Sequence, residues 1–214
     1  MALMLKNGLV YMHIPKTGGN WLTSLLEKND LVTGAAGHKH ATYEALVCTD
    51  AGKQAKAAGA AISGYFCVVR NPISWYESWY KYQCHREWRR WGVPGDLLRW
   101  HVMAGLNMAA PADFNVFMER VNYQSPGFVS HLYSRYTLGS GALVLKTETI
   151  RDDLLNLRRK TGLALPEADI LSFPKVGVSP PRPVQWEADL KRLTVTNEIT
   201  AFRAYGYDTE EALG

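Results

Sequence analysis

The 214-residue chain has few cysteines and no long hydrophobic run. Its three cysteines, Cys48, Cys67 and Cys84, form no C-x-x-C pair, so we expect neither a disulfide framework nor a zinc site. Polar residues and a glycine at positions 6–8 interrupt the apolar start of the chain, and no stretch approaches the roughly 20 apolar residues of a membrane span. The sequence therefore predicts a cytoplasmic protein without a membrane span.

The chain also lacks a strong charge of either sign. Its 24 Lys and Arg residues against 20 Asp and Glu residues leave a formal net charge of +4. This excess suits a small anionic ligand but is too weak to indicate a duplex nucleic acid, so we expect no nucleic-acid partner. With 47% hydrophobic residues and no internal repeat, the composition is that of one globular domain with a real core.

Three short apolar runs predict buried strands at residues 8–14, 64–70 and 141–146. A helical pattern follows each of them, at residues 20–28, 71–83 and 150–162. Strands that alternate with helices predict an α/β fold with a central, mainly parallel sheet flanked by helices. Further helices are expected at residues 111–121 and, as one or two, at 183–207. No break in composition divides the chain, so a single domain over residues 1–214 is predicted.

The first predicted strand ends in the turn PKTGG, and a helical pattern begins at once at Asn20. In open α/β sheets ligands lie beyond the carboxyl ends of the strands, and the start of a helix favours an anion. Gly18 and Gly19 permit positive φ and a close backbone approach, while Lys16 adds a charge and the Thr17 hydroxyl a donor. The turn thus predicts a phosphate-type site; a plain turn with a surface lysine is the alternative. Its spacing does not match the nucleoside-triphosphate pattern G-x-x-x-x-G-K-[ST].

The second predicted strand ends in Arg70, where an arginine is costly unless it meets an anion. Asn71 is a good helix N-cap and Pro72 a good first helical residue, so the next helix is expected to begin immediately. Ser78 lies two turns further along that helix. Arg70 and Ser78 are therefore candidates to bind a second phosphate; a structural ion pair and a plain surface serine are the alternative.

Together, the segments HIPKTGGN and RNPISWYESWY resemble the two signatures of the sulfotransferases that use 3′-phosphoadenosine 5′-phosphosulfate (PAPS). Within that family the chain is most similar to the carbohydrate sulfotransferases of the heparan-sulfate 2-O type and their bacterial and viral relatives. The resemblance implies a P-loop-like three-layer fold, with an excursion of helices and loops at about residues 84–140. One departure is Trp75, which stands where the second signature has an arginine.

In that family the first signature binds the 5′-phosphosulfate, and the arginine and serine of the second bind the 3′-phosphate. The resemblance thus implies cofactor-binding roles for Lys16, Thr17, Gly18, Gly19, Asn20, Trp21, Arg70 and Ser78. It extends to the strand–helix segment LVLKTETIRDDLLNL and to the ending ITAFRAYGY, and is poor from about residue 84 to 140.

The segment GHKHATYEAL places His38 and His40 on a loop before a short helix. An isolated histidine is more often structural than catalytic, and this H-x-H pair has no further metal ligands nearby in the sequence, so no metal is expected. The resemblance implies that His40 is the base that takes a proton from the acceptor hydroxyl, and that His38 orients the acceptor or the base. It also implies that Lys16 stabilises the charge on the departing phosphate oxygen.

These observations predict an enzyme that transfers a sulfuryl group from PAPS to a hydroxyl of a carbohydrate. The acceptor is expected to be a glycan or a small molecule. The alternatives are a P-loop-like kinase of a small molecule and a non-catalytic protein that binds nucleotides or anionic polymers. The segment 79–101, with its tryptophans and arginines, predicts either a site for an acidic sugar or a helical excursion with buried tryptophans.

Overall fold

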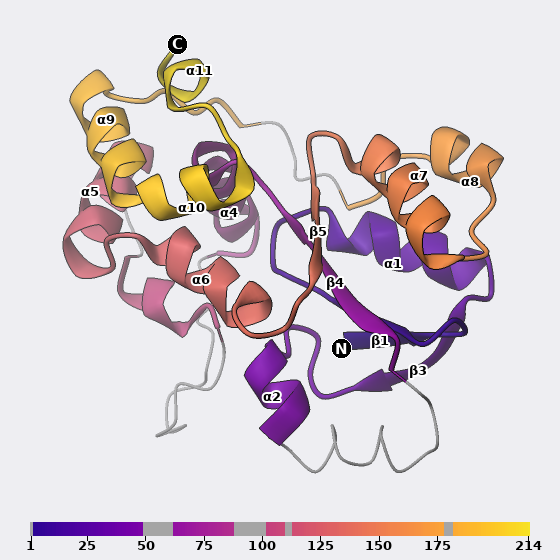
Figure 1. Cartoon of the computed structure of the whole chain (residues 1–214). Helices are drawn as coiled ribbons and strands as arrows, with labels where there is room; N and C mark the ends of the chain where they lie inside the picture. The colour runs from indigo at the N-terminus through magenta and orange to yellow at the C-terminus, as the bar shows by residue number, and fades with distance from the viewer. Residues whose placement is uncertain (1, 49–61, 88–101, 110–112, 178–181) are drawn as a thin grey trace. The chain divides into compact units, whose positions relative to one another are not determined.

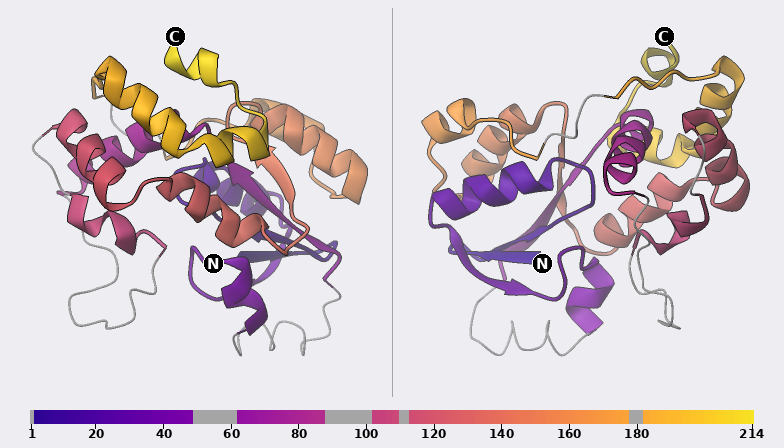
Figure 2. Two further views of the ribbon diagram at one scale, coloured as in Figure 1. Left: turned by 60° about the vertical axis from the view of Figure 1, so that its left-hand side comes forward. Right: turned by 180° about the vertical axis from the view of Figure 1, so that it is seen from behind.

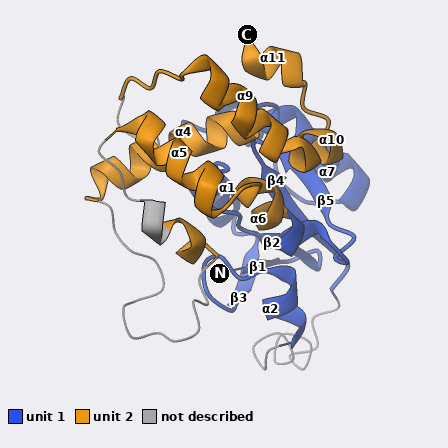
Figure 3. Ribbon diagram, turned by 90° about the vertical axis from the view of Figure 1, so that its left-hand side faces the viewer, with its two compact units in different colours: residues 1–70, 134–178 blue, residues 71–133, 179–214 orange. Residues whose placement is uncertain are grey.

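The computed structural model has an α/β fold with a five-stranded mixed sheet and ten α-helices among the residues that it describes (Figure 1). The described residues are 2–48, 62–87, 102–109, 113–177 and 182–214. They group into two compact units, which Figure 3 colours separately. Unit 1 consists of residues 1–70 and 134–178, and unit 2 of residues 71–133 and 179–214. The single domain predicted for the whole chain stays a prediction.

The sheet belongs to unit 1 and has the strand order β3-β1-β2-β4-β5. Its strands are β1 (Ala2–Leu5), β2 (Leu9–Met12), β3 (Val32–Ala36), β4 (Gly64–Val69) and β5 (Leu143–Lys146). The three predicted strands are β2, β4 and β5, and they pair in parallel, with Tyr11 beside Phe66 and Cys67 beside Val144. By contrast, β1 is antiparallel to both β2 and β3. The sheet is therefore mixed and partly parallel, which confirms the predicted α/β fold and the parallel pairing of the three predicted strands.

The antiparallel part arises from a hairpin that the sequence interpretation missed. Residues 6–8, Lys-Asn-Gly, form a tight turn between β1 and β2, in which the Gly8 N–H donates to the Leu5 carbonyl over 2.8 Å. Gly8 has φ = 83°, a left-handed value that glycine adopts without strain. Asn-Gly between two apolar runs is the strongest short-range signal for such a hairpin. The supposed interruption of the apolar start is the hairpin turn itself.

One face of the sheet is covered by α1 (Gly19–Lys28), α7 (Ile150–Thr161) and α8 (Glu167–Ser172), as Figures 1 and 2 show. Alternate strand residues such as Tyr11 and Phe66 pack there against Leu22 and Leu154. This alternation follows from the two-residue period of side chains along a strand. A short helix, α2 (Tyr43–Cys48), follows the loop that carries the two predicted histidines. The core thus fixes β2, β4 and β5 so that their carboxyl ends share one edge.

Unit 2 is helical. It contains α4 (Pro72–His85), the 3-10 helix η1 (Ala104–Ala109), α5 (Phe114–Gln124), most of α6 (Phe128–Thr137), α9 (Ala188–Asn197), α10 (Ile199–Tyr205) and α11 (Thr209–Leu213). The predicted start of α4 is confirmed: the Asn71 side chain accepts from the Ile73 N–H over 2.9 Å, and Pro72 is the first helical residue. The helices expected at 111–121 and 183–207 are α5, and α9 with α10.

A buried carboxylate organises the middle of unit 2. Glu198 is fully buried and accepts hydrogen bonds from the Tyr76 hydroxyl at 2.5 Å and from the Val129 N–H at 2.9 Å. The N–H and the hydroxyl of Ser130 each donate to its other oxygen over 2.7 Å. Glu198 therefore satisfies the first N–H groups of α6, which have no partner within the helix. Among the described residues, no helix is long and apolar enough to cross a membrane.

Candidate anion site at the carboxyl edge of the sheet

The turn after β2 leads directly into α1. Gly18 is the N-cap residue of α1 with φ = 81°, a left-handed conformation that excludes most other residues. In the part of the chain that the structure describes, no side chain caps the first N–H groups of α1. Lys16 is also left-handed, with φ = 66°, although it carries a side chain. The turn thus presents the open, electropositive end of a ten-residue helix.

Two threonines hold this turn. The Thr17 hydroxyl is buried and donates to the Ile14 carbonyl over 2.9 Å, so the hydroxyl predicted as a donor to an anion is used within the turn. Thr147, directly after β5, places its hydroxyl 3.0 Å from the Thr17 carbonyl and 2.9 Å from the Val69 carbonyl. Thr147 therefore ties the carboxyl ends of β4 and β5 to the turn. Sequence reasoning gave it no role.

Two cationic side chains gather at the turn. Arg70 follows β4, as predicted, and its Nη1 lies 3.5 Å from the Lys16 carbonyl. Burial, together with the charge of Arg70, lowers the pKa of Lys16 to about 8. A lysine with such a pKa is held in its charged form at a cost, and an anion between the two cations would remove that cost. The pair is what a phosphate or sulfate group would need.

Ser78, the predicted partner of Arg70, lies half-buried on α4 in unit 2, and their pairing stays a prediction. The same helix explains the departure at Trp75. That side chain is fully buried and stacks on Trp79, with ring centroids 5.9 Å apart. The position that is arginine in the family signature is here part of the core of unit 2.

The geometry separates the roles of the two predicted histidines. His40 Nδ1 lies 3.2 Å from the His13 carbonyl, which can only accept, so Nδ1 carries the proton and the lone pair is on Nε2. His38 Nδ1 accepts from the His40 backbone N–H over 3.2 Å, which leaves the proton of a neutral His38 on Nε2. Burial is the largest cause that lowers the pKa of His38, and the charge of Arg135 is a smaller one. His40 is thus arranged as a base, and His38 shapes the loop by accepting the His40 N–H.

The loop of the histidines is fastened to the turn and to α6. Lys39 Nζ donates to Asn20 Oδ1 over 2.8 Å, which joins the loop to the first turn of α1. The Tyr136 hydroxyl donates to the His40 carbonyl over 2.9 Å. Neither Lys39 nor Tyr136 was singled out in the sequence. Both contacts join residues far apart in the chain, and no local pattern announces them.

A third histidine, also missed, lies between the turn and the loop. His13 follows β2 and is only 5% exposed. A Cβ atom added at Gly19 would lie 1.9 Å from His13 Nε2, so the absence of a side chain at Gly19 makes room for this ring. The ring also meets that of His40 edge to face, with centroids 5.0 Å apart. Burial, with the neighbouring His40 and Lys39, keeps the pKa of His13 well below its usual value.

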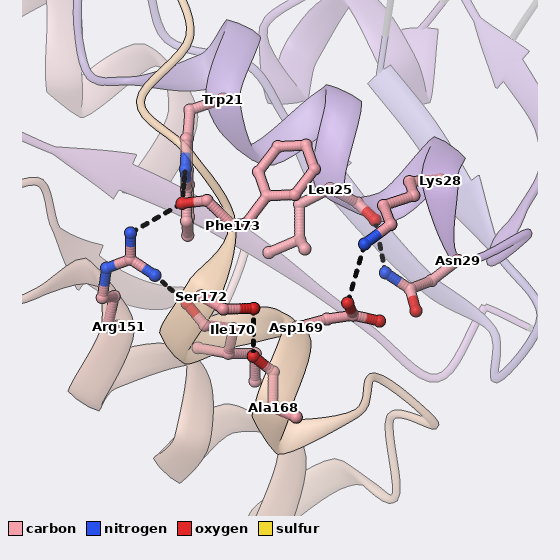
Figure 4. Close-up of polar contacts among 10 residues, drawn as sticks. All are labelled: Trp21, Leu25, Lys28, Asn29, Arg151, Ala168, Asp169, Ile170, Ser172 and Phe173. Carbon is pink, nitrogen blue, oxygen red and sulfur yellow. Dashed lines mark hydrogen bonds and ion pairs between the residues drawn. The ribbon is translucent and has the colours of Figure 1, made fainter.

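Trp21, predicted to bind the cofactor, is mostly buried at the start of α1. Its Nε1 donates to the Phe173 carbonyl over 3.4 Å (Figure 4). The Arg151 guanidinium lies 5.2 Å from the centre of the indole ring and donates to the Phe173 and Ile170 carbonyls. At the other end of α1, Lys28 pairs with Asp169 over 2.8 Å. Trp21 thus secures the segment after α8 to α1, and its contact with a cofactor stays a prediction.

The remaining predictions concern the acceptor and metals. Most of the aromatic and basic segment, residues 88–101, lies outside the described residues. Within the described part of it, Trp79 is buried and Arg86 lies over the Tyr82 ring. No group of three or more His, Cys, Asp or Glu side chains among the described residues is arranged to hold a metal ion. Comparison with protein-family models, with curated proteins and with solved structures finds no match for this chain.

Proposed function

We propose that this chain is a PAPS-dependent sulfotransferase that acts on a hydroxyl of a glycan or other small acceptor. The observation that carries the proposal is the convergence of Lys16, Arg70 and the open N-terminus of α1 at the carboxyl edge of the parallel strands. A base, His40, is held beside this anion site through the His13 carbonyl. The proposal includes a P-loop-like three-layer architecture for the whole chain.

The described residues fit the charged part of PAPS. The left-handed Gly18 and the uncapped N–H groups of α1 suit a phosphosulfate. A bound anion would also offset the burial and the charge of Arg70 that lower the pKa of Lys16. When bound, PAPS supplies the activated sulfuryl group. In the proposal, Arg70 and Ser78 hold the 3′-phosphate, which distinguishes this nucleotide from ATP.

The chain's own residues then have separate tasks. The lone pair on His40 Nε2 takes the proton of the acceptor hydroxyl as its oxygen attacks sulfur. Lys16 donates to the 5′-phosphate oxygen as the bond to sulfur breaks and that oxygen becomes anionic. His38 keeps the loop in place through the His40 N–H. Positioning and charge stabilisation perform most of the catalysis in such an in-line transfer.

A thermal-shift experiment tests the proposal against its alternatives. A ligand that binds only the native state raises the midpoint of unfolding by mass action. The sulfotransferase predicts a larger shift with 3′-phosphoadenosine 5′-phosphate (PAP) than with magnesium ATP, whereas a kinase predicts the reverse. A binder of anionic polymers would respond to neither nucleotide. Transfer of labelled sulfate from PAPS to a panel of neutral and acidic sugars then identifies the acceptor, and PAP binding without any transfer would leave only a nucleotide-binding protein.

A further inference from the structure

The ring of His13 packs between the first residue of α1 and the ring of His40. It lies against the first residue of α1, so close that Gly19 has no room for a Cβ atom, and the nearest ring atom to that point is Nε2. The ring of His40 meets it from another side. His13 therefore stands between the N-terminus of α1 and the candidate base.

The two ring nitrogens of His13 have no hydrogen-bond partner in the part of the chain that the structure describes. The His13 backbone carbonyl, by contrast, accepts from His40. His13 is nevertheless buried, with only 5% of its surface exposed. The fully buried side-chain atoms without a partner among the described residues do not include these two nitrogens, so the nitrogens remain accessible to solvent or to a ligand. A bound oxyanion at the helix N-terminus would supply the missing acceptor.

The electrostatic surroundings favour a neutral donor. The pKa of His13 is lowered by burial and by the nearby His40 and Lys39, so the ring is uncharged near neutral pH. A neutral imidazole carries one N–H, and Nε2, the ring atom nearest to a Cβ built at Gly19, can carry it. Such a donor can stabilise an anion without exchanging a proton with it, which leaves the proton transfer to His40.

We propose that His13 is a further catalytic residue, whose Nε2–H donates a hydrogen bond to an oxygen of the sulfuryl group in transit between donor and acceptor. The inference rests on the proposed function. The sulfuryl group is favoured over the nucleotide phosphates because His13 touches both the turn and His40, and only the transferred group passes between these two. Charge spreads over the sulfuryl oxygens during transfer, and a prepositioned donor acts where it develops.

A binding experiment on the full chain tests the contact without turnover. Imidazole ¹⁵N–¹H correlation spectra, with the His13 signals assigned from a His13→Phe variant, are recorded with PAPS and with PAP. PAPS carries the sulfuryl group and PAP does not. The proposal expects the His13 Nε2–H signal to shift with PAPS and to stay in place with PAP. An unmoved signal with PAPS, or equal shifts with both nucleotides, overturns it.

Turnover gives the second test. His13→Phe keeps a flat ring against Gly19 but removes the donor, so we expect PAP affinity to be unchanged while turnover at saturating PAPS falls by about 100-fold, as for loss of one oxyanion donor. Tyr11→Phe is the matched control: its hydroxyl, on β2, is likewise buried and has no hydrogen-bond partner among the described residues, and it should turn over like the wild type. Wild-type turnover for His13→Phe, or a parallel loss of PAP affinity, contradicts the proposal.

If His13→Phe does not fold, the pair His13→Asn and His13→Leu decides, because the two side chains have similar shapes and only Asn can donate. The asparagine variant must then be the faster one. If the wild type binds neither PAP nor PAPS, the proposed function fails, and inorganic sulfate becomes the probe. A shift of the His13 Nε2–H signal with sulfate would retain the donor role toward an oxyanion, and its absence would end it.

Discussion

The substitution Gly19→Ala places a methyl group where the structure has the ring of His13. The added Cβ would lie 1.9 Å from His13 Nε2, 2.0 Å from Cδ2 and 2.6 Å from Cε1. These separations are far below van der Waals contact, so the ring has to move. The ring is buried, with the ring of Tyr11 at 5.9 Å and that of His40 at 5.0 Å, so it has little space to enter.

Two effects oppose each other in this variant. Alanine is intrinsically better than glycine inside a helix by up to about 1 kcal/mol. Overpacking of a buried site costs roughly 1–3 kcal/mol, and here three ring atoms are affected at once. We therefore expect the upper end of this cost, less the helix gain, so that Gly19→Ala lowers the free energy of unfolding by about 2 kcal/mol, measured by urea denaturation followed by circular dichroism.

A double-mutant cycle with His13→Ala tests the cause, because removal of the ring should relieve the clash and give a favourable coupling energy. The matched control is Gly18→Ala. Its Cβ would have only ordinary neighbours, at 3.8 and 3.9 Å, so its cost comes from φ = 81° and His13→Ala should not reduce it. A Gly19→Ala protein as stable as the wild type, or equal coupling for both glycines, would refute the reasoning.

Further predictions concern the proposed site and unit 2. Because Lys16 has a pKa of about 8, its charge is lost as pH rises through that value; calorimetry should show PAP affinity falling above pH 8 in the wild type but not in Lys16→Arg. The same depressed pKa means that the folded state binds fewer protons than the unfolded state between pH 8 and 10.5, so Lys16 makes the free energy of unfolding rise with pH across that window. Arg70→Ala should weaken PAP by about 2–5 kcal/mol, far more than the nucleotide without its 3′-phosphate, and equal losses would remove Arg70 from the 3′-phosphate. His40→Ala should keep PAP affinity and lose roughly a hundred- to ten-thousand-fold in transfer, with a milder effect for His38→Ala, and the reverse order would exchange their roles. Glu198→Gln replaces an accepting oxygen with an NH₂ group facing fixed donors, and should lower the urea midpoint by an amount equivalent to roughly 1–3 kcal/mol; an unchanged midpoint would mean that the buried bonds are not needed.

Local signals in the sequence were enough for the parallel half of the sheet. The runs that became β2, β4 and β5 are short, apolar and flanked by glycine, and the cap formed by Asn71 and Pro72 fixes the start of α4 without help from the rest of the fold. The strands β1 and β3 were missed for different reasons. The first depends on an Asn-Gly turn that was taken for an interruption. The second, VTGAA, has little strand character of its own and is held by pairing with β1.

The site divides in the same way. Lys16 and Arg70 could be predicted together because parallel strands bring their carboxyl ends to one edge, whatever packs around them. Thr147 and Lys39 could not, since both act through contacts with residues more than 15 positions away. Ser78 shows the limit of a motif: its place on α4 follows from the sequence, but a phosphate shared with Arg70 depends on how two separate units meet.

The two glycines of the turn are needed for different structural reasons, which the sequence interpretation did not separate. Both were predicted to permit positive φ and a close approach of the backbone to phosphate. In the structure, Gly18 is glycine because its φ is left-handed, whereas Gly19 is glycine because the ring of His13 fills the space of a Cβ atom. The ring of His13 in turn contacts the ring of His40. The histidine and the second glycine of HIPKTGG, His13 and Gly19, therefore pack directly against each other. Because that contact also reaches the candidate base, a change at Gly19 is expected to disturb proton transfer as well as anion binding, whereas the strain at Gly18 acts on the turn alone.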